Sequence, residues 1–507
     1  MTKPAIDGRG AVIARLSALF TEWPDEHAIQ FEGTWWTWGH VGQVAASLAA
    51  ALAPDRVDTG SSGGAPVAVV MRQRPALVAA ELAVLALGRT ALLVSPLQPD
   101  GPLAADITTI SASVVVAHSI DWQRPGFAEA VAAAGVVGIE VDGDGGTVVR
   151  VAPSSSRRVV ESLDAAVTVL TSGTTGPAKR LPVSWESFVV LGGGPEGREP
   201  RSGRGAVILS LPLTTLGGLL SMSRLVFGGR PLSMMERFDV RTWAALVKEH
   251  RPKVIGAPPP VVKMILDADI SPDHFVGIEA YLTSSAAVDP EVARAFEARY
   301  GIPVLLGYGA TEFLNSVTGW TMALWTEFGA TKLGSVGRAY PGVRLRVLDP
   351  DDGRELAPDE SGVLEVDPPQ RAGHLSTGWL RTSDHARIDH DGFLWILGRT
   401  DDVIVRGGFK VDLAAVTATL LAHPSVAAAC VVGLPDDRLG TVPAAVVQLV
   451  DGASTSESAL VDWVREHLPP YAIPVMIRPV PSIPQTSTFK PDRVAIRQML
   501  GDGRASS

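Results

Sequence analysis

The sequence of 507 residues contains a single cysteine, Cys430, which lies in an apolar stretch. One cysteine excludes an intramolecular disulfide and any metal cluster held by several thiolates, so Cys430 is expected to be a packed thiol. The ten histidines are scattered without pairs at metal-ligand spacing, which disfavours a zinc site. The net charge of −10 lacks the basic excess typical of nucleic-acid-binding proteins, and no nucleic-acid partner is expected.

Long uninterrupted apolar runs are also missing. An apolar stretch such as residues 76–94 is broken by Glu81 and Arg89, so no transmembrane segment is expected. The first seven residues lack an apolar core and a cleavage site, which disfavours a secretory signal and predicts a cytoplasmic protein. The length exceeds that of a single-core domain and predicts several packed units, as in a large enzyme.

Short apolar strand patterns alternate with helical patterns in the first part of the chain. Residues 67–71, 91–94 and 114–117 are apolar runs of strand length. Their alternation with helices predicts a mostly parallel α/β sheet. A helix is expected over residues 10–20, and a β-hairpin over residues 28–38.

A different pattern follows this α/β part. Residues 343–348 and 362–366 alternate with a period of two, which predicts a small antiparallel subdomain. The polar turn at residues 398–402 separates two apolar strand patterns and is the expected interdomain hinge. The predicted fold class is therefore α/β: a large N-terminal domain of mostly parallel α/β subdomains plus a small β-rich subdomain, over residues 1–398, followed by a small α+β C-terminal domain over residues 399–507.

A hydroxyl- and glycine-rich turn follows the apolar strand pattern of residues 165–170. It reads Thr-Ser-Gly-Thr-Thr-Gly-Pro-Ala-Lys over residues 171–179. Gly173 and Gly176 let the backbone approach phosphate oxygens, and Lys179 supplies a positive charge. The spacing differs from that of a Walker loop, which has four residues between its glycines. The turn therefore predicts a polyphosphate site of another kind, against the alternative of a solvated turn.

This turn resembles the phosphate loop of the adenylate-forming superfamily, which includes acyl- and aryl-CoA ligases, peptide-synthetase adenylation domains and firefly-type luciferases. Other stretches resemble motifs of the same family, in the family's own order and along nearly the whole chain. They are residues 306–312, 378–384, 398–402 and 483–493. The resemblance to the acyl- and aryl-CoA ligase branch implies an enzyme that adenylates a carboxylic acid with ATP and Mg²⁺ and then transfers the acyl group to coenzyme A.

The resemblance also implies roles for individual residues. Tyr308 would stack on adenine, Thr311 would contact the α-phosphate, and Glu312 would ligate Mg²⁺, a hard cation that prefers carboxylate oxygens. Asp384 and Arg399 would hold the ribose, since a carboxylate can accept two hydroxyl protons. The full set implied to bind the nucleotide is Thr171, Ser172, Gly173, Thr174, Thr175, Gly176, Lys179, Ser284, Ser285, Ala286, Tyr308, Gly309, Asp384 and Arg399.

The remaining motifs concern catalysis and acyl transfer. Lys490 would be the catalytic lysine, which bridges the substrate carboxylate and the α-phosphate and offsets the charge that develops between them. Asp401 would be the hinge about which a mobile C-terminal domain rotates between the two reactions. Gly407 and Gly408 would line the route of the CoA thiol.

The sequence departs from the family's motifs at several places. Thr215 stands where many of these ligases have a histidine, two glutamates usual after the hinge are absent, and Phe489 replaces the glycine before the catalytic lysine. The acceptor therefore stays open between CoA, which the retained Gly407 and Gly408 favour, and a carrier-protein thiol or an amine. The alternative from another class is a catalytically impaired nucleotide-binding protein.

The acid itself is expected to be fatty, aromatic or polycyclic. The expected pocket walls are the surroundings of Trp185, residues 214–220, Thr283 and residues 313–320, and their apolar character suits an acyl chain or a ring better than a short polar acid. The sequence leaves a homodimer open.

Overall fold

The computed structural model describes residues 7–52, 64–151, 163–170, 180–202, 205–284, 286, 288–372, 378–399, 402–436, 438–486 and 489–502. The chain divides into two compact units. The first comprises residues 1–171, 179–327 and 369–376, and the second comprises residues 172–178, 328–368 and 377–507. The predicted domain boundary between residues 398 and 399 stays a prediction.

A seven-stranded sheet in the first unit has the strand order β7-β6-β5-β3-β4-β8-β9. Its strands are β3 (Val67–Val70), β4 (Ala91–Val94), β5 (Val114–His118), β6 (Val137–Val141), β7 (Thr147–Val151), β8 (Val167–Leu170) and β9 (Arg180–Val183). The inner strands run parallel, whereas β7 and β9 close the two edges antiparallel. β3 to β6 are buried along their whole length, as strands covered on both faces are. The predicted parallel α/β sheet is confirmed.

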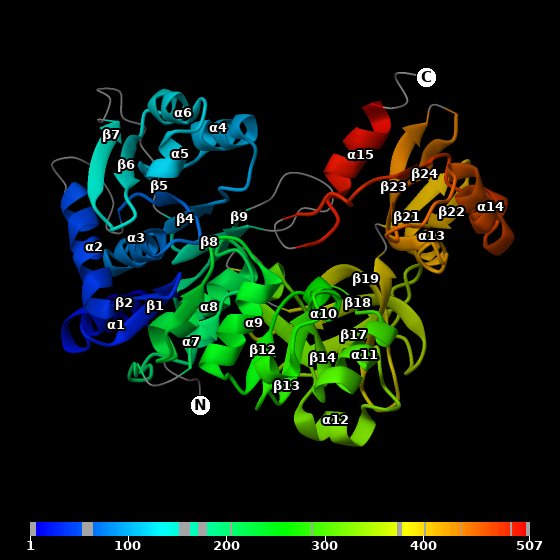
Figure 1. Cartoon of the computed structure of the whole chain (residues 1–507), viewed down its shortest axis with the longest axis horizontal. Coiled ribbons are helices and arrows are strands. Elements are labelled where there is room, and N and C mark those ends of the chain that lie inside the picture. The colour runs from blue at the N-terminus through cyan, green and yellow to red at the C-terminus, as the bar shows by residue number, and fades with distance from the viewer. Residues whose placement is uncertain are drawn as a thin grey trace. The chain divides into compact units, whose positions relative to one another are not determined.

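Helices cover both faces of this sheet (Figure 1). One face carries α1 (Gly8–Glu22), α2 (Trp38–Ala51) and α3 (Pro75–Ala86), and the other carries α4 (Asp100–Thr109), α5 (Ser119–Trp122) and α6 (Phe127–Ala133). Successive side chains of a strand point to opposite faces. Val67 and Val69 accordingly join the apolar core under α3, whereas Ala68 and Val70 join the core under α4 and α6.

Glu81 is a buried carboxyl group in α3, with only 1% of its surface exposed. Its Oε2 has no hydrogen-bond partner among the described residues. Burial raises the pKa of Glu81 from its ordinary value of 4.5 to about 8, so the side chain is protonated at neutral pH. The folded state therefore binds a proton that the unfolded state has released above pH 4.5. The stability that depends on this proton is complete below pH 4.5 and is lost as the pH rises through 8.

The substitution Glu81→Gln is expected to flatten the pH dependence of stability between pH 4.5 and 8. Glutamine has nearly the same shape and stays neutral, so a slope of up to about 1.4 kcal/mol per pH unit should disappear. Urea unfolding over a pH series measures this slope. Glu129→Gln, at an exposed position of α6, is the matched control and should leave the slope unchanged. An unaltered slope in Glu81→Gln would contradict a protonated Glu81.

The predicted hairpin forms part of a second sheet. This sheet consists of β10 (Val207–Ile208), β11 (Leu232–Met234), β1 (His27–Phe31) and β2 (Thr34–Thr37), in that order. Glu32 and Gly33 connect β1 and β2 with φ values of 49° and 78°, as a tight two-residue hairpin turn requires. The helices α7 (Trp185–Gly192) and α8 (Leu216–Phe227) also belong to the first unit, and they pack on each other.

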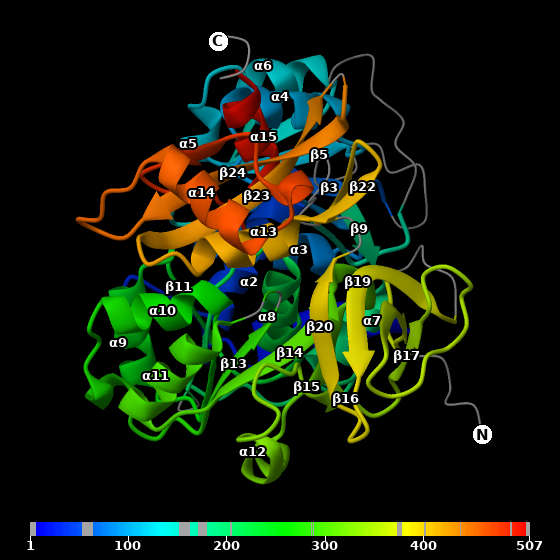
Figure 2. The same ribbon diagram turned by 90° about the vertical axis from the view of Figure 1, so that its right-hand side faces the viewer.

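The third sheet of the first unit carries the motif at residues 306–312. β12 (Val254–Gly256), β13 (Ala280–Ser284) and β14 (Val304–Ala310) are parallel, and β15 (Asn315–Gly319) returns antiparallel to β14. The associated helices are α9 (Val240–His250), α10 (Pro259–Asp267), η1 (Pro272–Phe275), α11 (Pro290–Tyr300), η2 (Thr311–Phe313) and α12 (Met322–Phe328). Figure 2 shows α9, α10 and α11 grouped on one side of β13.

The second unit begins with the predicted β-rich subdomain. After the short strand β16 (Arg338–Ala339), the strands β17 (Arg344–Leu348), β18 (Ser361–Asp367), β19 (Leu380–Ile388) and β20 (Leu394–Arg399) follow. β17 to β20 pair in chain order and are antiparallel throughout. The antiparallel subdomain predicted from the period-two pattern of residues 343–348 and 362–366 is confirmed.

The C-terminal part of the second unit is a sheet with helices on both faces. Its elements are β21 (Val403–Arg406), β22 (Phe409–Asp412), α13 (Leu413–Leu421), β23 (Val426–Asp436), β24 (Gly440–Leu449), α14 (Glu457–His467), η4 (Pro470–Ala472), β25 (Ile477–Pro479) and α15 (Arg493–Asp502). Val431 packs with α13 and α14, whereas its neighbours Cys430 and Val432 pack with α15. Figure 1 shows α15, in red, on the opposite side of β23 from α13. Cys430 is buried, as predicted.

The observed elements agree with the predicted fold class of an α/β body, a β-rich subdomain and an α+β C-terminal part. Among the helices in the described ranges, none combines the length and the apolar composition needed to cross a membrane.

Candidate active site

The predicted phosphate loop lies outside the described residues, as do Ser285 and Asp401. The loop residues concerned are Thr171, Ser172, Gly173, Thr174, Thr175, Gly176 and Lys179. The strands on either side of it are described. β8 ends at Leu170, which pairs with Arg180 of β9, and the Leu170 amide donates to the Thr214 carbonyl at 2.9 Å. The loop thus begins at the carboxyl end of a parallel strand, where α/β folds commonly bind ligands.

The motif at residues 308–312 runs from β14 into the turn η2. β14 and β15 change register between Tyr308 and Gly309. Glycine is needed at this point because a Cβ on Gly309 would lie 2.5 Å from the Asn315 carbonyl oxygen. In the turn that follows, Phe313 is buried and Glu312 is exposed. The local fold therefore leaves the Glu312 carboxylate accessible at the carboxyl end of a sheet.

Ser284 is the last residue of the neighbouring strand β13, and Ala286 follows that strand. β13 is parallel to β14, with Ser284 opposite Gly307, so the end of β13 lies beside Tyr308. Thr283 is buried, and its Oγ1 has no hydrogen-bond partner among the described residues. The structure thus brings the small residue Ser284 and the buried hydroxyl-bearing residue Thr283 to the strand that carries the predicted adenine-stacking tyrosine.

Asp384 and Arg399 lie directly opposite each other on the antiparallel strands β19 and β20. Nη1 of Arg399 is 3.9 Å from Oδ1 of Asp384, and Nη2 of Arg399 donates to the hydroxyl of Ser383. The side chains are 15% exposed for Asp384 and 38% exposed for Arg399. The structure therefore brings the two predicted ribose ligands together at a place that solvent reaches.

Lys490 lies in a tight turn shortly before α15. Gln485 and Pro491 pair across this turn, and the Thr486 amide donates to the Lys490 carbonyl at 2.7 Å. Phe489 has a φ of 61°, in the left-handed region that favours glycine. The turn thus keeps a glycine-type backbone at the position where the family's motif has glycine, at a cost of roughly 1–2 kcal/mol for a residue with a Cβ.

Gly407 and Gly408 form the turn between β21 and β22. Their φ values are 55° and 91°, and Arg406 pairs with Phe409 on either side, which defines a two-residue hairpin turn. The Gly407 amide donates to the Leu439 carbonyl at 2.8 Å. Turn geometry alone accounts for both glycines, so their role in acyl transfer stays a prediction.

Thr215, which replaces a family histidine, caps the N-terminus of α8. Its hydroxyl donates to the Pro212 carbonyl at 2.7 Å and accepts from the Gly218 amide at 3.4 Å. Such a cap satisfies an amide that the helix leaves without an internal partner. The replacement therefore has a structural function, and the side chain is held against its own loop.

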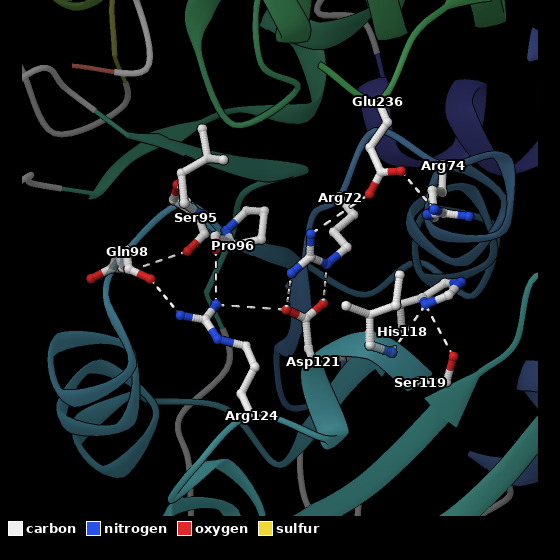
Figure 3. A network of polar contacts seen from close by, with 12 residues as sticks. Arg72, Arg74, Ser95, Pro96, Gln98, His118, Ser119, Asp121, Arg124 and Glu236 are labelled. Atoms are coloured by element: carbon white, nitrogen blue, oxygen red, sulfur yellow. Dashed lines mark hydrogen bonds and ion pairs between the residues drawn. The ribbon is translucent and has the colours of Figure 1, made fainter. Parts of the chain in front are cut away.

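The sequence reasoning missed a polar cluster at the carboxyl ends of β3 and β5 (Figure 3). Arg72 follows β3 and donates from Nε and Nη2 to the two carboxylate oxygens of Asp121, each at 2.8 Å. Asp121 is completely buried. Glu236 lies 3.7 Å from Arg72 and 2.5 Å from Arg74, which extends the network to a second sheet of the same unit.

This cluster occupies a topological switch point. β3 connects onward to its neighbour β4, whereas β5, on the other side of β3, connects onward to β6. Ligand crevices open at such points in α/β sheets, and here the ion-paired side chains of Arg72 and Asp121 lie at this point. His118 is buried in the cluster, and its Nδ1 accepts from the Ile120 amide at 3.2 Å. Burial and the nearby Arg74 lower the pKa of His118, which favours a neutral ring. This cluster could have been found in the sequence, because polar residues directly follow the two buried strands β3 and β5.

The predicted residues that the structure describes form two groups. The first unit carries Ser284, Ala286, Tyr308, Gly309, Thr311 and Glu312, and the second carries Asp384, Arg399, Gly407, Gly408 and Lys490. Within the described ranges, no group of three or more His, Cys, Asp and Glu side chains could hold a metal ion. A lone carboxylate such as Glu312 fits Mg²⁺, which is commonly bound through one or two carboxylates plus phosphate oxygens and water.

Family models match most of the chain. The model of the AMP-binding enzyme matches residues 17–373, and that of the AMP-binding enzyme C-terminal domain matches residues 416–490. Among similar proteins, 4-coumarate–CoA ligase-like 2 of Arabidopsis thaliana is 28% identical over 368 residues, which are 68% of this chain and 63% of that protein. The 2-succinylbenzoate–CoA ligase of Geobacillus kaustophilus is 29% identical over 410 residues, which are 76% of this chain and 81% of that protein.

Solved structures share the fold. ATP-bound MatB from Rhodopseudomonas palustris superimposes with a TM-score of 0.76 at 24% identity, covering 97% of this chain and 99% of that one. The amide bond synthetase McbA from Marinactinospora thermotolerans gives a TM-score of 0.74 at 24% identity, with the same coverage of 97% and 99%. These likenesses confirm the predicted fold class. Together with the family models, they lead to one assignment: the chain belongs to the AMP-binding enzyme family, which confirms its resemblance to the adenylate-forming enzymes.

Proposed function

We propose that the protein is an acid–thiol ligase that activates a carboxylic acid with ATP and Mg²⁺ and transfers the acyl group to coenzyme A. In the first step, a carboxylate oxygen attacks the α-phosphorus of ATP, and the bond to pyrophosphate breaks. In the second step, the CoA sulfur attacks the acyl carbon, the bond to AMP breaks, and the thiol proton passes to solvent. The observation that carries the proposal is the match of both family models, in order, across residues 17–373 and 416–490.

The nucleotide would be held by the residues whose roles the family resemblance implies. The exposed carboxylate of Glu312, after β14, suits a Mg²⁺ ion shared with the phosphates. Asp384 and Arg399, side by side on β19 and β20, offer an acceptor and donors to ribose hydroxyls. Tyr308 would stack on adenine beside the small residues Ser284 and Ala286. Residues 171–179 would bind the pyrophosphate leaving group.

Lys490 would act in the first step alone. Its ammonium group would offset the negative charge that develops between the carboxylate and the α-phosphate. The domain of residues 399–507 would then rotate about Asp401 and replace Lys490 by Gly407 and Gly408, so that the thiol reaches the acyl carbon.

An amine or a carrier-protein thiol is the second candidate acceptor. The departures at Thr215 and Phe489, together with the fold shared with an amide bond synthetase, favour keeping this candidate. The acid is proposed to be aromatic, fatty or polycyclic, and the aryl and acyl ligases among the relatives support the inclusion of such acids in a first screen.

A pyrophosphate-release screen over these acids, each with and without CoA, tests the function. We expect acid-dependent release of pyrophosphate and, with CoA present, a thioester of the same acid. Adenylate formation without a thioester, but with an amide when amines are supplied, would select the second acceptor. No release with any acid would contradict the proposed activity and favour a nucleotide-binding protein without catalysis.

A further inference from the structure

Asp402 and Arg493 form an ion pair inside the C-terminal part of the second unit. Nη1 of Arg493 contacts Oδ1 of Asp402, and Nη2 donates to Oδ2 at 3.1 Å, so the pair is bidentate. Asp402 is 7% exposed, and the Arg493 side chain is 25% exposed. The two residues are 91 positions apart in the chain. Asp402 directly follows the proposed pivot Asp401, and Arg493 follows Lys490 by three residues.

Hydrogen bonds close the turn that carries Lys490 and attach it to the start of α15, where Arg493 lies. The Lys490 amide donates to Oγ1 of Thr486 at 3.3 Å, and the Asp492 amide donates to the Pro484 carbonyl at 2.8 Å. The two strands of the turn are therefore joined at its base. Oδ1 of Asp492 also accepts from the Ala495 amide at 3.0 Å, which fixes the turn to the first residues of α15. A displacement of Arg493 would thus move the turn that carries Lys490.

Apolar contacts already hold this segment on the sheet. Ile483, Ile496 and Leu500 are buried against Cys430 and Val432 of β23. A buried ion pair adds little net stability, because the loss of hydration cancels most of the attraction between the charges. The planar guanidinium group of Arg493, with its two donors, instead fixes the orientation and the distance of Arg493 relative to the Asp402 carboxylate. Apolar contacts do not fix an orientation in this way.

We propose that the Asp402–Arg493 pair is a positioning clamp that fixes the Lys490 turn relative to the pivot. The clamp rests on the proposed function, in which Lys490 acts in adenylation and the domain rotates about Asp401. When the domain rotates about the pivot, the Asp402–Arg493 ion pair would keep the turn that carries Lys490 in a fixed position and orientation relative to the pivot. Because Lys490 has no proposed part in acyl transfer, losing the clamp should slow the first step and spare the second.

The half-reactions test this separation in Arg493→Gln. We expect acid-dependent pyrophosphate release to fall by roughly 10- to 100-fold, since a misplacement of about 1 Å costs up to about 100-fold. The reaction of chemically prepared acyl-adenylate with CoA should stay within about twofold of the wild-type rate. Arg465→Gln is the matched control, because Arg465 pairs with Asp462 on the exposed face of α14. It should change neither half-reaction.

A charge exchange provides the rescue. The double variant Asp402→Arg with Arg493→Asp should recover part of the adenylation rate that either single substitution loses. Equal losses in both half-reactions, in step with a lower unfolding temperature and without rescue, would show a merely structural role and overturn the proposal.

Hydrogen exchange gives a readout that does not depend on activity. In Arg493→Gln, the hydrogen-bonded amides of Thr486, Phe489, Lys490 and Asp492 should exchange at least about tenfold faster, whereas the amides of α14 should not change. An unchanged exchange rate in the turn would overturn the clamp even if the enzyme is active. If the wild-type protein released no pyrophosphate, the proposed function would fail, and hydrogen exchange alone would still decide whether Arg493 holds the turn.

Discussion

Replacing Lys490 by alanine is expected to lower acid-dependent pyrophosphate release by roughly 100- to 1,000-fold. This range is typical for removing one group that stabilises developing charge in a transition state. The turn that carries Lys490 is closed by backbone hydrogen bonds from Thr486 and Asp492, so truncating the side chain should leave its backbone in place. The expected loss is therefore chemical and should appear in the rate of adenylation rather than in stability.

The second half-reaction distinguishes this loss from general damage. Lys490→Ala should still convert preformed acyl-adenylate and CoA to the thioester at close to the wild-type rate. Lys263→Ala is a suitable control, because Lys263 is an exposed lysine paired with Asp267 on α10. Adenylation at the full rate in Lys490→Ala would show that Lys490 is not the catalytic lysine.

The substitution Asp121→Ala should have the largest effect on stability. It removes the carboxylate that pairs with Arg72, while the Arg72 side chain stays only 16% exposed. The nearest remaining acid to that guanidinium is Glu236, at 3.7 Å. Breaking a buried pair in this way typically costs about 3–5 kcal/mol, because one charge is left buried without a partner.

Denaturant unfolding of the two variants Asp121→Ala and Asp267→Ala measures this cost against a matched control. Asp267 pairs with Lys263 on α10, and the two side chains are 59% and 56% exposed. An exposed pair is worth about 0–1 kcal/mol, so Asp267→Ala should unfold almost like the wild type. Similar unfolding of the two variants would contradict a structural role for the buried pair.

The parallel strands of the first unit could be predicted because a buried strand is recognisable from a short run of apolar residues. A parallel strand covered on both faces is apolar throughout, as in residues 67–70, and neighbouring residues suffice to recognise it. The antiparallel strands β17 and β18 could be predicted equally well. A sheet with one covered face has apolar and polar residues alternating along each strand, with a period of two. The hairpin expected over residues 28–38 also forms, as β1 and β2.

The site residues stay predictions from contiguous motifs, whereas ion pairs between distant parts of the sequence were missed. Nothing near Asp402 in the sequence indicates Arg493, and nothing near Arg72 indicates Asp121, because the fold alone brings them together. Thr215 shows a further limit. Its sequence suggested only the loss of a possible positive charge, whereas the backbone around it makes a helix cap.

The position of Cys430 has a practical consequence for following the proposed rotation. It is the only cysteine in the chain, it is 3% exposed, and burial raises the pKa of its thiol, so thiol-reactive dyes should spare it in the folded protein. The exposed positions of Glu129 and Arg465 belong to different units. Glu129→Cys combined with Arg465→Cys would therefore accept a fluorescent donor and acceptor without any change to the native core. In single molecules, a change in the efficiency of energy transfer between the two dyes would then mark the proposed rotation from adenylation to acyl transfer.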